Sequence, residues 1–248
     1  MIEVRNLCKS FSGRPVLKDV SVTIKDAETF AVLGQSGSGK TVLLKNIIGL
    51  LQPDSGQIIV DGVDTSTLSY REIRRLRENF GVLFQGGALF DSMTAFDNVA
   101  FPLRMIRRLP EKDVREQAMR CLEVVHLEDA ANKLPSELSG GMQKRVALAR
   151  AISLQPKYVF YDEPTSGLDP KTSNTINQLI KDLDQRLGIT GIVITHDMHS
   201  CLEIADRIAF IHDGRIHWTG TVDDLHAATD EILLDFVTAS EYQIGRKH

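Results

Sequence analysis

The chain has 248 residues, enough for one large domain or two modest ones. With 42% hydrophobic and 25% charged residues, its composition is that of an ordinary globular protein and excludes a disordered chain. The formal net charge of -4 argues against a broad, sequence-independent surface for nucleic acid, so no nucleic-acid partner is expected. Basic runs at 71–77 and 104–108 are interpreted as solvated helix faces, with contact to a partner or to anionic lipid as the alternative.

Three cysteines, Cys8, Cys121 and Cys201, stand apart without the spacing of a metal or redox site. They are expected to be buried thiols in a reducing compartment. The longest apolar run near the start, Phe30–Leu33, is too short to span a bilayer, and no basic-then-apolar signal opens the chain. We therefore expect the protein in the cytoplasm, or at a membrane where partners hold it.

Short β-rich segments alternate with amphipathic helical ones, which predicts an α/β architecture. The dipeptides Asp61-Gly62 and Asp213-Gly214 predict tight two-residue hairpins. Runs at 158–162 and 192–195 are apolar without alternation, as in parallel strands covered on both faces. Strands are expected at 2–4, 20–24, 29–33, 57–60, 81–84, 158–162, 192–195, 207–212 and 215–218, and helices at 41–51, 111–128, 143–154 and 231–238.

Between residues 88 and 155 the pattern changes to helices, and we interpret 88–155 as a helical subdomain inserted into the α/β core. The core then comprises 1–87 and 156–220, and a helical tail follows over 221–248. In the inserted subdomain one helix face of 111–128 is apolar at helical spacing, through Val114, Ala118, Cys121, Leu122 and Val125.

The segment GQSGSGKT, residues 34–41, matches the phosphate-loop pattern between a predicted strand and a predicted helix. Its glycines let the backbone wrap around phosphate oxygens, and the helix N-terminus adds a partial positive charge. Lys40 is expected to reach the β- and γ-phosphates and Thr41 to bind Mg²⁺. A Gly/Ser turn that merely starts a helix is the alternative. The loop residues expected to bind nucleotide are Gly34, Ser36, Gly37, Ser38, Gly39, Lys40 and Thr41.

The segment YVFYDE, residues 158–163, is an apolar strand that ends in two carboxylates. Asp162 is suited to hold Mg²⁺ through its water shell, and Glu163 to accept a proton from the attacking water. Two acidic residues at a strand end can otherwise serve as a solubilising edge.

The segment LSGGM, residues 138–142, opens a helix with a serine cap and two glycines that leave N–H groups accessible. This is a second anion site, formed by Ser139, Gly140 and Gly141, although the same pattern also occurs as an ordinary helix cap. Two half-sites for one triphosphate on one chain indicate that two copies of the chain share each nucleotide.

In their order, these motifs together with Gln85, SGLD (166–169) and His196 resemble those of the ATP-binding cassette (ABC) ATPases over residues 1 to about 220. The resemblance implies a P-loop NTPase fold, with a mixed sheet core, an N-terminal antiparallel β-subdomain and the inserted helical subdomain. It also implies ATP and Mg²⁺ as ligands.

Within that resemblance, Gln85 matches the residue that senses Mg²⁺ and attacking water and links to the transport subunit. Asp169, in the loop that crosses the dimer interface, also resembles a helix cap because Pro170 follows it. His196 matches the histidine that contacts the γ-phosphate, with a satisfied strand-end histidine as the alternative. Phe11, with Val16 beside it, matches the aromatic that stacks on adenine, and a core phenylalanine is the alternative.

A narrower resemblance lies in 84–104, FQGGALFDSMTAFDNVAFPLR, which is similar to MlaF-type ATPases of Mce-associated lipid transporters. This is where ABC ATPases receive the membrane subunit, and Leu89, Phe90, Met93 and Phe96 are candidates to line that groove or simply to pack the subdomain. Some proteins of that type clasp a partner with a longer C-terminal tail; since this chain ends at His248, such a clasp is not expected.

The resemblance implies an ATPase that drives lipid, in particular phospholipid, transport as a dimer with two shared ATP sites. Its implied partners are a second copy, an integral permease docking near Gln85, and Mce-domain and accessory subunits, at the cytoplasmic face of the inner membrane. Two alternatives stay open: an importer ATPase for amino acids or another small polar solute, and an ABC ATPase outside transport.

Overall fold

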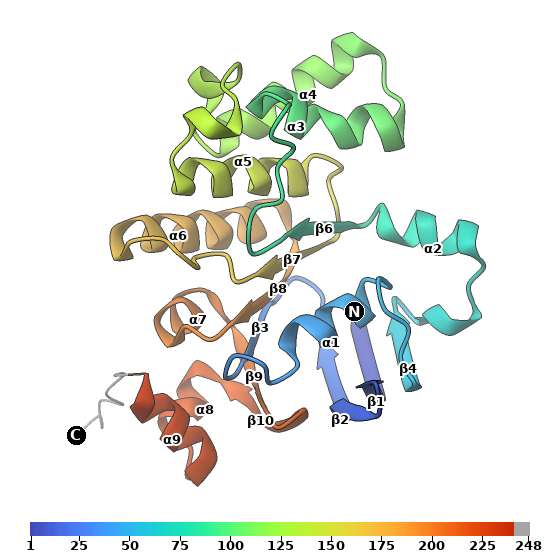
Figure 1. Cartoon of the computed structure of the whole chain (residues 1–248), viewed down its shortest axis with the longest axis vertical. Coiled ribbons are helices and arrows are strands. Elements are labelled where there is room, and N and C mark those ends of the chain that lie inside the picture. The colour runs from blue at the N-terminus through green and yellow to red at the C-terminus, as the bar shows by residue number, and fades with distance from the viewer. Residues whose placement is uncertain (241–248) are drawn as a thin grey trace. The chain divides into compact units, whose positions relative to one another are not determined.

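The computed structural model describes residues 1–240 and divides the chain into two units (Figure 1). One unit comprises Met1–Arg74 and the chain from Thr190 onward, and the other comprises Arg75–Ile189. The helical subdomain expected over 88–155 lies within the second unit, which continues beyond it. The boundaries of the expected domains stay a prediction, and the last part of the expected tail, 241–248, lies outside the described residues.

In the first unit, one sheet is antiparallel throughout, with the order β2-β1-β4-β5. It confirms the antiparallel β-subdomain. Alternate buried side chains such as Ile2, Val4 and Ile24 form its core face, as period-2 patterning requires. Its strands are β1 (Ile2–Phe11), β2 (Arg14–Ile24), β4 (Ser55–Val60) and β5 (Val63–Asp64).

The other strands of the first unit form a mixed arrangement around β3 (Thr29–Leu33), all of whose residues are buried. β3 runs parallel to β8 (Thr190–Thr195) and to β9 (Arg207–His212), and β10 (Arg215–Thr221) returns antiparallel to β9. The helices of this unit are α1 (Lys40–Ile47), α7 (Met198–Ile204), α8 (Val222–His226) and α9 (Glu231–Ala239), and α2 (Tyr70–Arg77) begins in it.

The second unit is mainly helical and gathers its helices around α5 (Gly140–Ile152) (Figure 1). α5 packs against α3 (Ala95–Pro102), α4 (Glu111–Val124) and α6 (Pro170–Leu187), as well as against β6 (Phe80–Leu83). β6 pairs in parallel with β7 (Tyr158–Asp162). A π-helix at Leu103–Arg107 follows α3, and short 3-10 turns occur at Glu128–Ala130 and Pro135–Glu137. A further 3-10 turn, Thr65–Thr67, lies in the first unit.

Several predicted elements are confirmed with their bounds, namely β3, β7 and β9. Both hairpin turns are confirmed as well, because Asp61 and Gly62 (φ 50° and 81°) and Asp213 and Gly214 (φ 46° and 75°) adopt the left-handed pairs that tight hairpins require. The apolar face predicted for α4 is buried at all five of its positions, Val114, Ala118, Cys121, Leu122 and Val125.

Other predicted bounds are wrong for local reasons. The helix expected to reach residue 51 ends at Ile47, because Gly49 turns left-handed (φ 74°) just after it. The helix expected to reach residue 128 ends at Val124, since His126 is left-handed too (φ 55°). The helix expected from residue 143 begins at Gly140, where the Ser139 hydroxyl caps it.

Buried thiols are found at Cys121 and Cys201, and the expectation is wrong for Cys8, which is half-buried. Burial raises the pKa of the Cys121 thiol to about 11. Among residues 1–240, no helix combines the length and apolar character needed to cross a bilayer.

Candidate nucleotide-binding site

The phosphate loop connects the end of β3 to the start of α1, as the sequence predicts. Gly37 (φ 82°) and Gly39 (φ 105°) have left-handed backbones, which suit glycine. Gly39 also lacks room for a side chain, because a Cβ there would lie 2.9 Å from Cδ2 of Leu17. Ser36 is exposed and Thr41 is half-buried.

Two polar side chains of this loop, those of Lys40 and Ser38, are suited to bind an anion. The Lys40 Nζ donates hydrogen bonds to the carbonyl oxygens of Gly34 (2.7 Å) and Gln35 (2.9 Å), which keeps its ammonium group at the loop. The Ser38 hydroxyl is buried, and no partner is found for it within residues 1–240. Because buried polar groups are normally paired, this hydroxyl fits a phosphate oxygen as its partner. The loop residues therefore fit a phosphate group.

His196 follows the strand next to the one that leads into the loop. β8 and β3 run parallel, with Thr195 opposite Leu33. His196 and Gly34 are the next residues of the two strands, so they lie at the same sheet edge. His196 is exposed there. The structure thus brings His196 and the phosphate loop together, as a contact with the γ-phosphate requires.

Phe11 and Val16 flank the turn between β1 and β2. Phe11 is 43% exposed, which excludes the core-phenylalanine alternative, and Lys9 Nζ lies 5.6 Å from its ring centroid. Val16 is half-buried and borders the phosphate loop, since a Cβ at Gly39 would lie 3.1 Å from the Val16 carbonyl oxygen. Adenine stacking on Phe11 stays a prediction.

In the second unit, Gln85 and Glu163 occupy matching positions at the ends of paired strands. Leu83 lies opposite Tyr161 in the parallel pair of β6 and β7, and Gln85 and Glu163 each follow two residues later. Asp162 and Glu163 are 5% and 8% exposed. Such burial argues against a merely solubilising edge, because charged groups are buried at a cost that function or pairing must offset.

A lysine of α5 joins the two strand ends. Lys144 is buried, and its Nζ donates hydrogen bonds to the backbone carbonyl oxygens of Gln85 and of Glu163 (3.2 Å for the latter). Burial lowers the pKa of Lys144, and the nearby carboxylates of Asp162 and Glu163 oppose that shift. Lys144 is not among the residues predicted from the sequence. One feature of the sequence does indicate Lys144. It lies on the same helix face as the buried residues Ala147 and Ala151, and that face is otherwise apolar.

The LSGGM segment caps α5 and packs against α6. The Ser139 hydroxyl accepts a hydrogen bond from the Met142 N–H (3.3 Å), which caps α5. Ser139 and Gly140 are exposed. A Cβ at Gly141 would lie 2.5 Å from the methyl carbon of Thr172, so this glycine lets the two helices approach closely.

Asp169 caps α6, as predicted from the proline that follows it. Its carboxylate accepts hydrogen bonds from the N–H (3.0 Å) and the hydroxyl of Thr172, and these bonds lower the Asp169 pKa. Thr172 thereby links the loop at 166–169 to the glycine-rich start of α5. Thr172 is not among the predicted site residues, because it belongs to no motif of its own.

The predicted site residues are divided between the two units. The first unit holds the phosphate loop, Phe11, Val16 and His196. The second unit holds Gln85, Asp162, Glu163, Ser139, Gly140, Gly141 and Asp169.

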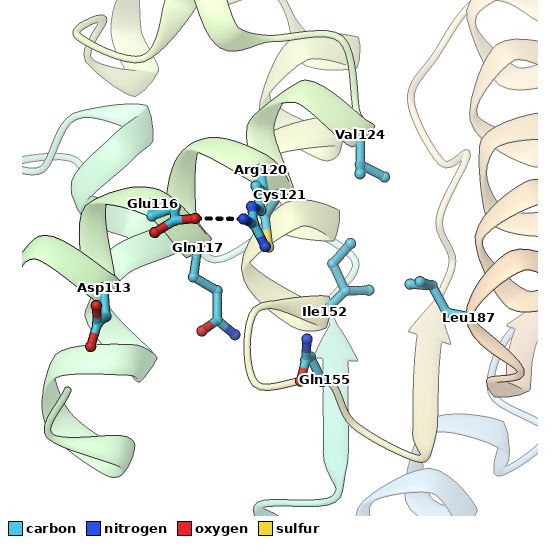
Figure 2. A pocket seen from close by; sticks show the side chains of 9 residues that line it. All are labelled: Asp113, Glu116, Gln117, Arg120, Cys121, Val124, Ile152, Gln155 and Leu187. Carbon is cyan, nitrogen blue, oxygen red and sulfur yellow. Dashed lines mark hydrogen bonds and ion pairs between the residues drawn. The ribbon is translucent and has the colours of Figure 1, made fainter.

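A cavity of about 380 Å³ lies elsewhere in the second unit, beside α4 and the end of α5 (Figure 2). Arg120 and Glu116, which form an ion pair, line this cavity. Cys121, Ile152 and Leu187 form an apolar part of its wall. None of the predicted site residues lines it.

Comparison with known proteins identifies the family. The sequence pattern of the ABC transporter family matches residues 17–166. Over 237 residues the chain is 43% identical to the intermembrane phospholipid transport system ATP-binding protein MlaF of Haemophilus influenzae, which covers 96% of this chain and 90% of that protein. Over 228 residues it is 44% identical to the methionine import ATP-binding protein MetN of Carboxydothermus hydrogenoformans, covering 91% of this chain and 67% of that protein.

A solved structure gives the same result for the fold. The dimeric, post-hydrolysis ATP-binding cassette MJ0796, bound to ADP and Pi, matches with a TM-score of 0.82 and 34% identity, over 90% of this chain and 99% of that one. The predicted ABC ATPase fold is therefore confirmed. Together with the geometry of the phosphate loop, these matches show that the chain belongs to the ABC transporter family and is an ATPase that uses ATP with Mg²⁺.

Proposed function

We propose that this ATPase energises the transport of a lipid, in particular a phospholipid, through a separate membrane permease at the cytoplasmic face of the inner membrane. A second copy of the chain would complete two ATP sites, with Mce-domain and accessory subunits as further partners. The similarity to MlaF and the segment 84–104 support the lipid assignment.

The proposed contact with the permease rests on the structure of the loop after Gln85. Phe90 is 42% exposed, and its ring lies 4.9 Å from the ring of Phe101 on α3. Asn98 holds this loop from inside through hydrogen bonds with both the N–H and the carbonyl of Phe90. An exposed aromatic group on a fixed loop directly after Gln85 is suited to receive an apolar element of a membrane subunit. Leu89, Met93 and Phe96 are half-buried around it.

The site residues have distinct proposed roles. Lys40 and the loop N–H groups hold the phosphates, and His196 contacts the γ-phosphate. Mg²⁺ neutralises charge on the phosphate oxygens, and its protein ligands would be the hydroxyl of Thr41, the amide of Gln85 and, through water, Asp162. Hydroxyl, amide and carboxylate oxygens are the hard donors that Mg²⁺ prefers.

Glu163 is the proposed general base and provides the test of the mechanism. We expect Glu163→Gln to bind ATP normally, to lose turnover by about 10²–10⁴-fold, and to form a stable ATP-bound dimer. ATPase assays, nucleotide binding and size-exclusion chromatography with ATP measure these properties. Glu123→Gln, an exposed change on α4, is the matched control and should behave as the wild type. Wild-type turnover in Glu163→Gln would overturn the assigned role.

One alternative cargo has support of its own. The similarity to MetN is as high as that to MlaF, so an amino-acid importer is the second candidate. The complex purified from detergent-solubilised membranes separates the two. A permease recovered with an Mce-domain protein and bound phospholipid supports lipid transport. ATPase activity that rises with methionine and its binding protein, and not with phospholipid, supports the importer, and recovery without any permease contradicts both.

A further inference from the structure

Helix α5 carries two basic side chains whose hydrogen bonds end on backbone carbonyls of the segment that follows β6. Lys144 bonds to the Gln85 carbonyl, and Arg150 donates to the carbonyls of Gly87 and Ala88, at 2.7 Å each. Burial lowers the pKa of both groups, so each cation is kept in the interior at a cost. The carbonyls of Gln85, Gly87 and Ala88 are thereby tied to one helix.

The same lysine also bonds to Glu163, whose backbone is unusual. Glu163 has φ 49°, in the left-handed region that side-chain-bearing residues seldom adopt. Such a conformation costs energy and persists where surrounding contacts fix it, most often at functional sites. The Glu163 carbonyl accepts hydrogen bonds from Lys144 Nζ and from the Ser166 N–H (3.2 Å). Ser166 is a local contact within the same turn, whereas Lys144 comes from another element.

We propose that Lys144 is a positioning residue that fixes the backbone of Glu163 to that of Gln85, so that the segment receiving the permease and the proposed general base move as one piece. Displacement of residues 85–88 by a docked membrane subunit then reaches Glu163 through this ammonium group, in addition to the pairing of β6 with β7. This inference rests on the proposed roles of Gln85 and Glu163 and adds to them the route by which transport and hydrolysis are coupled.

Lys144→Met in the full-length chain tests the inference, because methionine keeps an unbranched apolar stem and removes the donor. A carboxylate displaced by about 1 Å costs on the order of 10²-fold in rate, so we expect kcat to fall 10- to 100-fold. The affinity for ATP should stay within about twofold, because the phosphate loop is unchanged. Lys144→Arg, which can still donate to two carbonyls, should restore much of kcat.

Arg145→Met is the matched control on the same helix. Arg145 likewise donates to two carbonyls, those of Val125 and His126, but these directly follow α4 and are not part of the site. It should lose thermal stability to a similar extent while keeping kcat.

The outcomes separate this inference from the proposed function. Wild-type kcat in Lys144→Met, beside an inactive Glu163→Gln, overturns the positioning role and leaves the general base in place. Full activity of Glu163→Gln instead overturns the general-base role on which the inference rests. Equal losses of kcat in Lys144→Met and Arg145→Met also overturn the coupling. If Lys144→Met does not fold, Lys144→Gln decides by the same criteria, since its shorter side chain does not reach both carbonyls and the link between them is still broken.

Discussion

Neighbouring glycines at the start of α5 have opposite surroundings. A Cβ at Gly140 would lie 3.5 Å from Cδ2 of Leu168, an ordinary contact, whereas one at Gly141 would lie 2.5 Å from the Thr172 methyl. The Thr172 methyl has little freedom to retreat, because the Thr172 hydroxyl is bonded to the Asp169 carboxylate. The requirement for glycine is therefore steric at Gly141 and not at Gly140.

This difference predicts opposite effects of two alanine substitutions on stability. Gly141→Ala should lower the free energy of unfolding by about 1–3 kcal/mol, the usual cost of overpacking. Gly140→Ala should leave it unchanged or raise it by about 0.5–1 kcal/mol, because alanine is the better helix residue. Urea denaturation of the two variants measures both values. Equal effects would show that the close approach of α5 and α6 is not fixed in this way.

At the scale of an element, Asn98 organises the loop before α3. It is fully buried, its Oδ1 accepts from the Phe90 N–H (2.8 Å), and its Nδ2 donates to the carbonyls of Phe90, Met93 and Thr94. Thr94 also caps α3 by accepting from the Asp97 N–H. One side chain thus replaces a strand or helix partner for the backbone of 90–94, which is otherwise irregular.

Asn98→Ala should therefore loosen the proposed docking loop. Unpaired backbone groups cost about 1–3 kcal/mol, so the free energy of unfolding should fall by that amount and the loop should become sensitive to protease. Recovery of the permease in pull-downs should drop, while the ATPase activity of the isolated chain should stay within about threefold. Asn132→Ala, at an exposed asparagine of the same unit, is the control. Unchanged recovery of the permease would place the docking surface elsewhere.

At the scale of the whole molecule, sequence patterns predicted the features that depend on residues close together in the chain. Apolar runs located β3, β7 and β9, and motif spacing located the phosphate loop and the two strand-end carboxylates. β1 and β2 are longer than expected because bulges interrupt the alternation in β1, where register shifts separate Val4, Leu7 and Lys9.

Contacts between segments far apart in the chain could not be predicted from the sequence. Lys144 bonds to a carbonyl 59 residues away, and Arg150 to one 63 residues away. Backbone carbonyls are present at every residue, so no side-chain pattern marks the ones that Lys144 and Arg150 select. The left-handed backbone of Glu163 is hidden for the same reason, because glutamate carries no signal for it.

Shared ATP sites make a prediction that only the assembled dimer can test. If each site combines Lys40 of one copy with Ser139 of the other, Lys40→Ala and Ser139→Arg homodimers both lack an intact site. A mixed dimer of the two variants regains one, since the unaltered phosphate loop of the Ser139→Arg chain meets the unaltered LSGGM of the Lys40→Ala chain. The expected result is one nucleotide retained per mixed dimer, measured with radiolabelled ATP after purification through two different tags in the Glu163→Gln background.

A cis arrangement is the control for that experiment. With both changes on one chain and none on the other, each site contains one altered half, so shared sites retain no nucleotide. Sites that lie wholly within one copy give the opposite pattern: the unaltered chain keeps its own site in the cis pair, and the mixed pair has none. Because the two arrangements contain the same substitutions, a difference in retained nucleotide reports the geometry of the site and not the severity of either change.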